Sequence, residues 1–390
     1  MEPSLLGYSD WAAQRPRGGL ERMTAGEEAL NYRLGKVHEQ VRQYFPFVVR
    51  IAVALYDAKT DDIKTFLHSP AEDSPLRNYR TKLAGAGWLD ELRRSRRSRV
   101  IDELGPSVLG SQPHSLRIIA AEYKSSYTVP IFDDGRFLGF VFFNADRSRV
   151  FSDGVTRQLD LFVKIISLIV ENALRSVSVL VGGLHLLREI SRFRDDETSN
   201  HLSRMSYFAE LIAGRIAASV GRTDDWVEYV RLFAPLHDIG KIATPDTILF
   251  KPGQLTEAES DVMQQHAAKG AEILMALIDG LSLDRIPHIG SLLHIARHHH
   301  ERWDGKGYPD GLSGERIPVE ARITQVADVF DALTSRRCYK AAWPVEKAAA
   351  FLREGAGTRF DPQCVELFLA RNDEIVGIMN RFADESSEAT

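Results

Sequence analysis

The chain has 390 residues, of which 44% are hydrophobic and 26% are charged, and its formal net charge is −5 at pH 7. This composition is typical of folded globular proteins and leaves room for two or three domains. The negative charge argues against binding to a nucleic acid polymer, and two cysteines exclude a disulfide framework and a thiolate metal site. The N-terminus has no apolar signal core, and charged residues interrupt the most apolar window, 162–181. We therefore expect a cytoplasmic protein without membrane insertion.

The first part of the chain has the pattern of a small α/β unit. Residues 1–26 are rich in Gly, Pro and Arg without periodicity and predict a flexible tail, and a helix is expected over about 27–44. Runs of β-forming residues separated by turn signals then predict strands over 47–56, 63–68, 126–132 and 137–144. The last two runs are joined by Asp133-Asp-Gly-Arg136, which is a strong hairpin signal.

The stretch between the two pairs of strands, about 79–104, is predicted to be helical. It carries a cluster of basic residues: Arg93, Arg94, Arg96, Arg97 and Arg99. Such a cluster can bind an anion. A solvated helix face is the simpler interpretation of the same charges.

The last two predicted strands and the helix after them resemble the closing half of a GAF domain. The resemblance is carried by Tyr127-Thr-Val-Pro-Ile131, Gly135, Leu138-Gly139 and Phe151-Ser-Asp153. GAF domains are small sensory modules that bind ligands or only dimerise, and the chain lacks an obvious Asn-Lys-Phe-Asp-Glu signature of the cyclic-nucleotide-binding members. The resemblance implies a GAF-like sensory domain over residues 27–155 and leaves open whether it has a ligand.

A long helix is predicted from about 153 to 193. Apolar residues recur along it at spacings of three and four: Phe162, Ile166, Ile169, Ala173, Val177, Leu180, Leu184 and Leu187. This spacing is typical of a coiled-coil seam, so we expect residues 156–193 to form a linker helix that holds a homodimer together. The alternative is that the stripe packs on the chain's own domains. Gly182-Gly183 interrupts the helical pattern and is interpreted as a joint.

The second half of the chain carries an ordered series of histidines and carboxylates at metal-ligand spacings. Eight of the twelve histidines fall between His201 and His300. The candidate ligands are Glu197, His201, His237, Asp238, His266, His299, His300 and Asp328. Imidazole and carboxylate groups suit iron, manganese and zinc, so the series predicts a metal-dependent hydrolase site.

The adjacent His237 and Asp238 are expected at the centre of this site. Histidine supplies a neutral nitrogen, and the two oxygens of the carboxylate can bridge two metal ions. Lys241 lies three residues beyond Asp238, where it can meet an anionic oxygen of a substrate. Thr256-Glu-Ala-Glu259 is a capping-box pattern, so a helix is predicted to begin there and to carry His266 facing inward.

The most specific run in the chain is His299-His-Glu-Arg-Trp-Asp-Gly-Lys-Gly-Tyr-Pro309. Together with the other candidate ligands it resembles the HD-GYP family, which are HD-superfamily phosphodiesterases that degrade the bacterial second messenger cyclic di-GMP. The resemblance covers about residues 189–370 and implies an all-α HD-type bundle, with a catalytic domain over residues 194–390. The same stretch contains Lys251-Pro-Gly253, Arg322-Ile323 and Phe360-Asp-Pro362, which belong to the resemblance.

The functional residues of the family carry over by position. Its metal ligands match the eight candidates above, its site lysine matches Lys241, and the tyrosine that stacks near a guanine matches Tyr308. Its substrate-binding arginine and lysine match Arg337 and Lys340, although the residues between and before them depart from the usual Asp-Arg-Pro-Tyr-Lys. His298 is assigned outside the metal ligands.

The resemblance implies hydrolysis of cyclic di-GMP to linear pGpG, with or without a further step to GMP. Two metal ions, iron or alternatively manganese, would activate water and neutralise phosphate oxygens, with Asp238 as the bridging carboxylate. Family members with glutamate at the position of Glu197 resemble a three-metal subgroup; the alternative is that Glu197 orients a ligand histidine. A non-catalytic cyclic di-GMP receptor and an HD phosphohydrolase acting on another nucleotide are the other two hypotheses.

Overall fold

A computed structural model describes residues 29–70, 76, 79–84, 87–105, 118, 120–190, 199–281, 283, 286–335 and 342–383. The predicted tail over residues 1–26 lies outside this part of the chain. The described residues fall into two compact units, which are divided within one helix between Arg175 and Ser176. The domain limits expected from the sequence, at 155 and 193, stay predictions.

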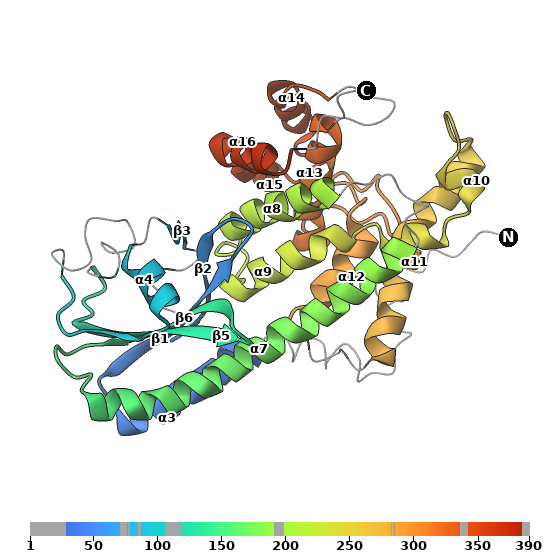
Figure 1. The fold of residues 1–390 in the computed structure, drawn as a ribbon. Coiled ribbons are helices and arrows are strands. Elements are labelled where there is room, and N and C mark those ends of the chain that lie inside the picture. The colour runs from blue at the N-terminus through green and yellow to red at the C-terminus, as the bar shows by residue number, and fades with distance from the viewer. Residues whose placement is uncertain are drawn as a thin grey trace, which may run out of the picture. The chain divides into compact units, whose positions relative to one another are not determined.

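The first unit is an antiparallel sheet with helices on both faces (Figure 1). Its six strands have the order β3-β2-β1-β6-β5-β4. Helix α3 (Ala29–Tyr44) and the first part of α7 (Asp153–Ile190) lie along one face, and α4 (Trp88–Ser95) lies on the other. The strands are β1 (Val48–Asp57), β2 (Asp62–Ser69), β3 (Arg80–Lys82), β4 (Arg99–Ile101), β5 (Ser125–Asp133) and β6 (Arg136–Ala145).

The predicted α/β class of this unit is confirmed, and so are its first helix and its two long hairpins. The turn between β5 and β6 shows why the local sequence is a strong signal. Asp134 and Gly135 have φ values of 45° and 84°, and two successive positive φ values match the right-handed twist of the strands they join.

The prediction of one helix over residues 79–104 was wrong. The structure has two short strands there, β3 and β4, on either side of the two-turn helix α4. Only Leu89 and Leu92 of α4 are buried, so its apolar face is too short to support a longer helix. The chain leaves the helix at Arg96 in the left-handed conformation, and Arg99–Ile101 then extends the edge of the sheet along β5.

Helix α7 confirms the predicted long helix and continues through Gly182 and Gly183 without a break. Its side chains do not share one environment. Ile166 is 1% exposed, and on the same half of the helix Asp160 accepts a hydrogen bond of 2.6 Å from the Tyr127 hydroxyl of β5. At Ile166, therefore, the predicted seam packs on the chain's own unit, which is the alternative that the sequence left open.

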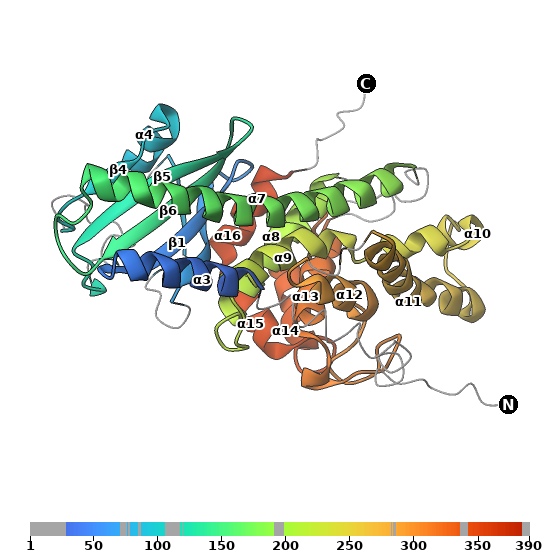
Figure 2. The same cartoon turned by 90° about the horizontal axis from the view of Figure 1, so that it is seen from below.

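The second unit is helical, as predicted (Figure 2). Helix α8 packs against α9, α13 and α15, and the rings of Phe208, Phe330 and Phe368 meet edge to face in the core between them. The elements are α8 (Ser199–Ile216), α9 (Asp224–Phe233), η2 (Ala234–Leu236), η3 (Ile239–Ala243), α10 (Asp246–Leu249), α11 (Glu257–Gly280), α12 (Ile289–His298), η4 (Gly314–Arg316), α13 (Val319–Thr334), α14 (Val345–Gly355), α15 (Pro362–Leu369) and α16 (Asn372–Arg381).

The predicted capping box at the start of α11 is present. The Thr256 hydroxyl accepts from the Glu259 backbone N–H, while the Glu259 carboxylate accepts from the Thr256 backbone N–H at 2.8 Å. Throughout the described residues, none of the helices combines the length and the apolar character needed to cross a membrane.

Candidate metal centre

Four of the predicted ligands converge in the second unit. Asp238, His266, His299 and His300 each offer one ligand atom, and these atoms all lie within 4.8 Å of one another. They come from separate elements, because Asp238 precedes η3, His266 lies on α11, and the two adjacent histidines follow α12. Three imidazoles and a carboxylate in so small a space form a donor set that suits a divalent metal ion.

Asp238 lies at the centre of the group. Its Oδ1 is 3.1 Å from His266 Nε2 and 3.6 Å from His299 Nε2, and its Oδ2 is 3.2 Å from His237 Nε2 and 2.6 Å from Lys241 Nζ. Burial alone would raise the pKa of Asp238, but the Lys241 ammonium and the His237 imidazole outweigh it and hold that pKa well below its usual range. The carboxylate is therefore ionised and turns its two oxygens to different partners.

The histidines are oriented by the backbone. In His237, His266 and His299, Nδ1 lies 3.0, 2.7 and 3.0 Å from a carbonyl oxygen three or four residues earlier. A ring nitrogen that faces a carbonyl carries the proton, so in the neutral ring Nε2 keeps the lone pair that a metal ion would bind. Burial lowers the pKa of His299 and lowers that of His300 further, which keeps both imidazoles neutral. Neutral imidazole is the form that binds metal.

A glycine allows the elements to come this close. A Cβ atom on Gly240 would lie 1.9 Å from the His266 carbonyl oxygen and 2.5 Å from the Gly270 nitrogen. Any other residue would push η3 away from α11 and separate Asp238 from His266. The glycine of His-Asp-x-Gly-Lys is therefore needed for close backbone contact.

Two further predicted ligands lie at the border of the group. His237 is fully buried, and its Nε2 is 3.9 Å from Asp328 Oδ1 on α13. The structure thus joins Asp328 to the four converging residues through His237 and Asp238. Lys241, which was predicted to meet the substrate, forms its ion pair with Asp238.

His201 is buried on α8 but is not among the four converging residues. Its Nδ1 is 2.6 Å from Asp331 Oδ2, and Arg204 Nε donates to Asp331 Oδ1 at 2.6 Å. Burial would raise the pKa of Asp331, but these two partners lower it. Asp331 therefore fixes the ring of His201. The predicted ligand Glu197 lies outside the described residues, and so do the predicted substrate contacts Arg337 and Lys340.

The Gly-Tyr-Pro loop borders the converging residues. The Tyr308 ring is 4.7 Å from the His300 ring, centroid to centroid. A Cβ atom on Gly307 would lie 2.3 Å from the Arg302 nitrogen and 2.5 Å from the Glu301 Cα, so only glycine fits the turn before the tyrosine. Burial raises the pKa of Tyr308, which keeps its hydroxyl protonated. The ring is thus presented beside the candidate ligands.

Two acidic residues that hold this loop were missed in the sequence. The Glu301 carboxylate accepts from the Asp310 and Leu312 backbone N–H groups at 2.7 and 3.0 Å. Asp310 pairs with Arg297 at 2.7 and 2.8 Å, and with His298 Nε2 at 3.0 Å. His298 therefore lies in the support of the loop. In the sequence, Glu301 directly follows the histidine pair and Asp310 directly follows the Gly-Tyr-Pro run. This placement was the signal that could have identified them.

Comparison with known proteins identifies this region. Residues 192–364 match the family described as HD domain. Over 204 residues the chain is 46% identical to the cyclic di-GMP phosphodiesterase response regulator RpfG of Xanthomonas campestris pv. campestris (strain 8004), covering 52% of this chain and 51% of that protein. Over 191 residues it is 40% identical to 3'3'-cGAMP-specific phosphodiesterase 2 of Vibrio cholerae, covering 49% of this chain and 34% of that protein.

A solved structure of a GAF domain/HD domain protein from Geobacter sulfurreducens is 20% identical, with a TM-score of 0.32, and the match covers 38% of this chain and 96% of that chain. The chain spans about half the length of the first relative and about a third of the second. The second unit carries an HD domain, a helical fold that binds divalent metal ions. This HD domain follows the α/β unit in the same chain.

Proposed function

We propose that the chain is a metal-dependent phosphodiesterase that hydrolyses cyclic di-GMP to linear pGpG. The observation that carries the proposal is the convergence of Asp238, His266, His299 and His300 beside Lys241. The 46% identity with a relative named cyclic di-GMP phosphodiesterase supports the substrate. The regulatory role of the first unit is part of the same proposal.

The donor set fits a divalent metal ion, because it combines neutral imidazoles with an ionised carboxylate. We assign the remaining ligand positions to His201, His237, Asp328 and Glu197. Iron is the proposed metal and manganese the alternative, since both accept nitrogen and oxygen ligands. When bound, such ions activate water and neutralise phosphate oxygens. The site would hold two ions, or three if Glu197 is a ligand.

The side chains of the protein have separate roles in this proposal. Lys241 Nζ lies 2.6 Å from Asp238 Oδ2, so its ammonium is in place to donate to a phosphoryl oxygen and to stabilise the charge that develops there. Tyr308 offers its ring beside the site for a guanine base. Arg337 would clamp phosphate oxygens with two donors, and Lys340 would act as a point charge.

The test is metal analysis of protein purified without oxygen, together with chromatographic measurement of pGpG from cyclic di-GMP. Asp238→Ala should lower the metal content and abolish turnover while leaving the circular dichroism spectrum unchanged. Asp261→Ala is a matched control, because Asp261 is exposed on α11 away from the group. Turnover of Asp238→Ala at the wild-type rate would overturn the proposal.

A second candidate substrate is 3'3'-cGAMP, because one relative at 40% identity is named as specific for it. The two cyclic dinucleotides share the phosphodiester and differ in one base. The ratio of their kcat/KM values under the same metal load decides between them. Metal-loaded protein that binds cyclic di-GMP without hydrolysing either compound would support the receptor hypothesis.

We also propose that the protein is a homodimer through α7. The support is an apolar stripe on the side of the helix away from Ile166. Leu161, Ile165 and Leu168 are 61%, 46% and 56% exposed and follow one another at spacings of four and three. Such a stripe suits pairing with the same stripe of a second chain.

A further inference from the structure

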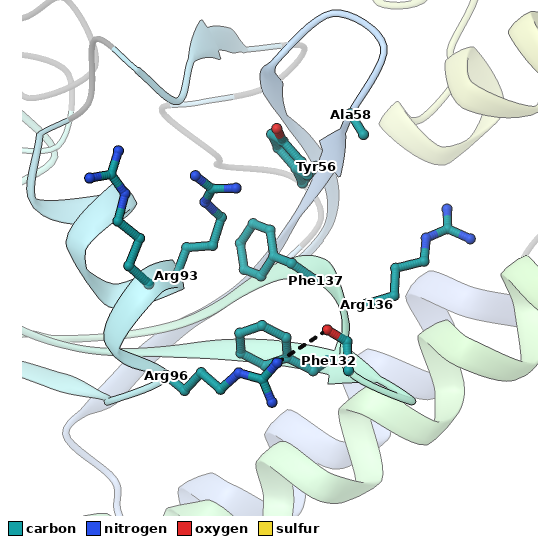
Figure 3. A pocket seen from close by; sticks show the side chains of 9 residues that line it. Tyr56, Ala58, Arg93, Arg96, Phe132, Arg136 and Phe137 are labelled. Carbon is teal, nitrogen blue, oxygen red and sulfur yellow. Dashed lines mark hydrogen bonds between the residues drawn. The ribbon is translucent and has the colours of Figure 1, made fainter.

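An open pocket of about 520 Å3 lies in the first unit, at the C-terminal end of α4 (Figure 3). Three segments that are distant in the sequence enclose it: the end of α4, the end of β1 and the hairpin between β5 and β6. All of its lining residues belong to the unit that spans residues 27–175, so the pocket shares no residue with the candidate metal centre.

Four arginines line the pocket. Arg93, Arg94 and Arg96 come from the end of α4, and Arg136 comes from the hairpin on the other side. Arg93 and Arg94 share one carboxylate, that of Asp90, at 2.6 and 2.5 Å. Across the described part of the chain, Arg96 and Arg136 form no ion pair. The lining therefore carries an excess of positive charge that converges from two elements.

Three aromatic rings lie between these charges (Figure 3). The Phe137 ring is 5.3 Å from the Tyr56 ring and 5.3 Å from the Phe132 ring, so the three form a continuous ladder. All three side chains are only partly buried. The Arg96 guanidinium lies 4.7 Å from the centroid of Phe132, within the range of a cation–π contact. The pocket thus combines planar apolar surfaces with planar cations.

The arginines on α4 have a simpler explanation, because basic residues in the last turn stabilise a helix through its dipole. That explanation does not extend to Arg136, which lies on another element. It also leaves Arg96 unexplained. Arg96 caps the helix with φ 56° and ψ 24°, a left-handed conformation in which glycine or asparagine is usual. From this position the side chain reaches Phe132 and the Gly135 carbonyl, to which it donates at 3.4 Å.

We propose that this pocket binds a small phosphorylated nucleotide. Guanidinium groups match phosphate oxygens in charge and geometry, and partly exposed aromatic rings stack on a base. The volume lies in the range of small-molecule sites, roughly 300–1,000 Å3. A nucleic acid polymer is disfavoured, because the site is a single pocket and the whole chain has a net charge of −5. A mononucleotide such as GTP and a cyclic dinucleotide offer the same chemistry.

The experiment is isothermal titration of the full-length protein with GTP, with cyclic di-GMP and with inorganic pyrophosphate. One of the two nucleotides should bind, and Arg136→Gln and Arg96→Gln should each weaken that binding about tenfold or more, the effect of losing a charge-assisted hydrogen bond. Arg97→Gln is the matched control, because Arg97 is exposed in the same cluster but does not line the pocket. Its affinity should equal that of the wild type.

Because the metal centre can also take up cyclic di-GMP, only the binding that Arg136→Gln removes is assigned to the pocket. Tyr56→Leu should weaken nucleotide binding while leaving any pyrophosphate binding unchanged. Equal affinity of the wild type and Arg136→Gln for both nucleotides would overturn the proposal. Pyrophosphate that binds as tightly as the nucleotides would also overturn it, because pyrophosphate has no base to stack on the rings.

Discussion

Two aspartates on α13 are expected to respond differently to the same substitution. Asp331 is fully buried and accepts from Arg204 at 2.6 and 3.0 Å, from Ser335 Oγ at 3.0 Å, and contacts His201 at 2.6 Å. Asp328 lies one turn earlier, with its side chain 19% exposed, and its Oδ1 is 3.9 Å from His237 Nε2. We expect Asp331→Ala to destabilise the fold and Asp328→Ala to lower metal content at nearly unchanged stability.

The expected loss of stability follows from the charge of Arg204, which Asp331→Ala leaves without its partner. Asp331→Ala leaves the buried guanidinium of Arg204 without its carboxylate, which costs about 3–5 kcal/mol in free energy of unfolding. With a urea m-value of about 2 kcal/mol per molar, the unfolding midpoint should fall by roughly 2 M. Asp328→Ala removes a partly exposed group without a close partner, so its cost should stay below about 1 kcal/mol.

The assay is urea unfolding of both metal-free variants, followed by circular dichroism, with metal content measured on reconstituted samples. Measuring metal-free protein isolates the effect of each substitution on the free energy of unfolding, because a bound ion would stabilise the wild type by mass action. Equal midpoints for the two variants would refute the assignment of Asp331 as the residue that holds Arg204 and His201. Full metal content in Asp328→Ala would refute its role as a ligand.

Three further predictions concern the substrate, the metal content and the oligomeric state. Arg337→Ala should raise KM for cyclic di-GMP about tenfold at unchanged metal content, by loss of a phosphate hydrogen bond, and an unaltered KM in steady-state kinetics would place the substrate elsewhere. Glu197→Ala should reduce the metal content from about three ions per chain to about two, and a wild type that saturates at two would assign Glu197 an orienting role. Leu161→Glu combined with Leu168→Glu should yield monomers in light scattering, whereas a monomeric wild type would remove the dimer.

Local patterns predicted the parts of the fold that depend on neighbours in the sequence. Asp-Asp-Gly-Arg specified the β5–β6 turn, because positive φ values are favourable at its central residues. The prediction of a helix over residues 79–104 was wrong for the opposite reason. Arg99–Ile101 is a strand because it pairs with Ser126–Thr128 of β5, and a partner so far along the chain leaves no local signal.

The candidate site likewise contains residues that local patterns predicted and residues that depend on distant partners. The spacing of Asp238, His266 and the histidine pair predicted residues that do converge, and His237 lies beside them. It did not identify Asp331 or Arg204, because an aspartate on a helix looks like a surface residue until the helix against it is known. The contact between Asp331 and His201 spans 130 residues. Buried charges are therefore predicted poorly, since their cost is offset by partners that only the folded chain supplies.

The last prediction concerns the stability of the fold at acid pH, and it depends on Asp310, the residue after the Gly-Tyr-Pro run. Burial opposes its charge, but hydrogen bonds from His298 and Arg297 lower its pKa to about 2. A carboxylate with a depressed pKa in the folded state stabilises the fold above its unfolded pKa of about 4, and this contribution is lost as the pH falls toward 2. The two pKa values differ by about two units, which corresponds to about 2.7 kcal/mol, and solvent screening of this partly buried group reduces the contribution to about 2 kcal/mol.

Asp310→Asn removes this titration while keeping the shape of the side chain. The variant should be less stable than the wild type by about 2 kcal/mol at pH 6, and the gap should narrow at pH 3, where Asp310 of the unfolded wild-type chain is largely protonated. Urea unfolding of both proteins at the two pH values measures the gap directly. Because only the difference between the proteins is used, acid titration elsewhere in the chain cancels. A gap that stays the same at both pH values would show that Arg297 and His298 hold the loop without the charge of Asp310.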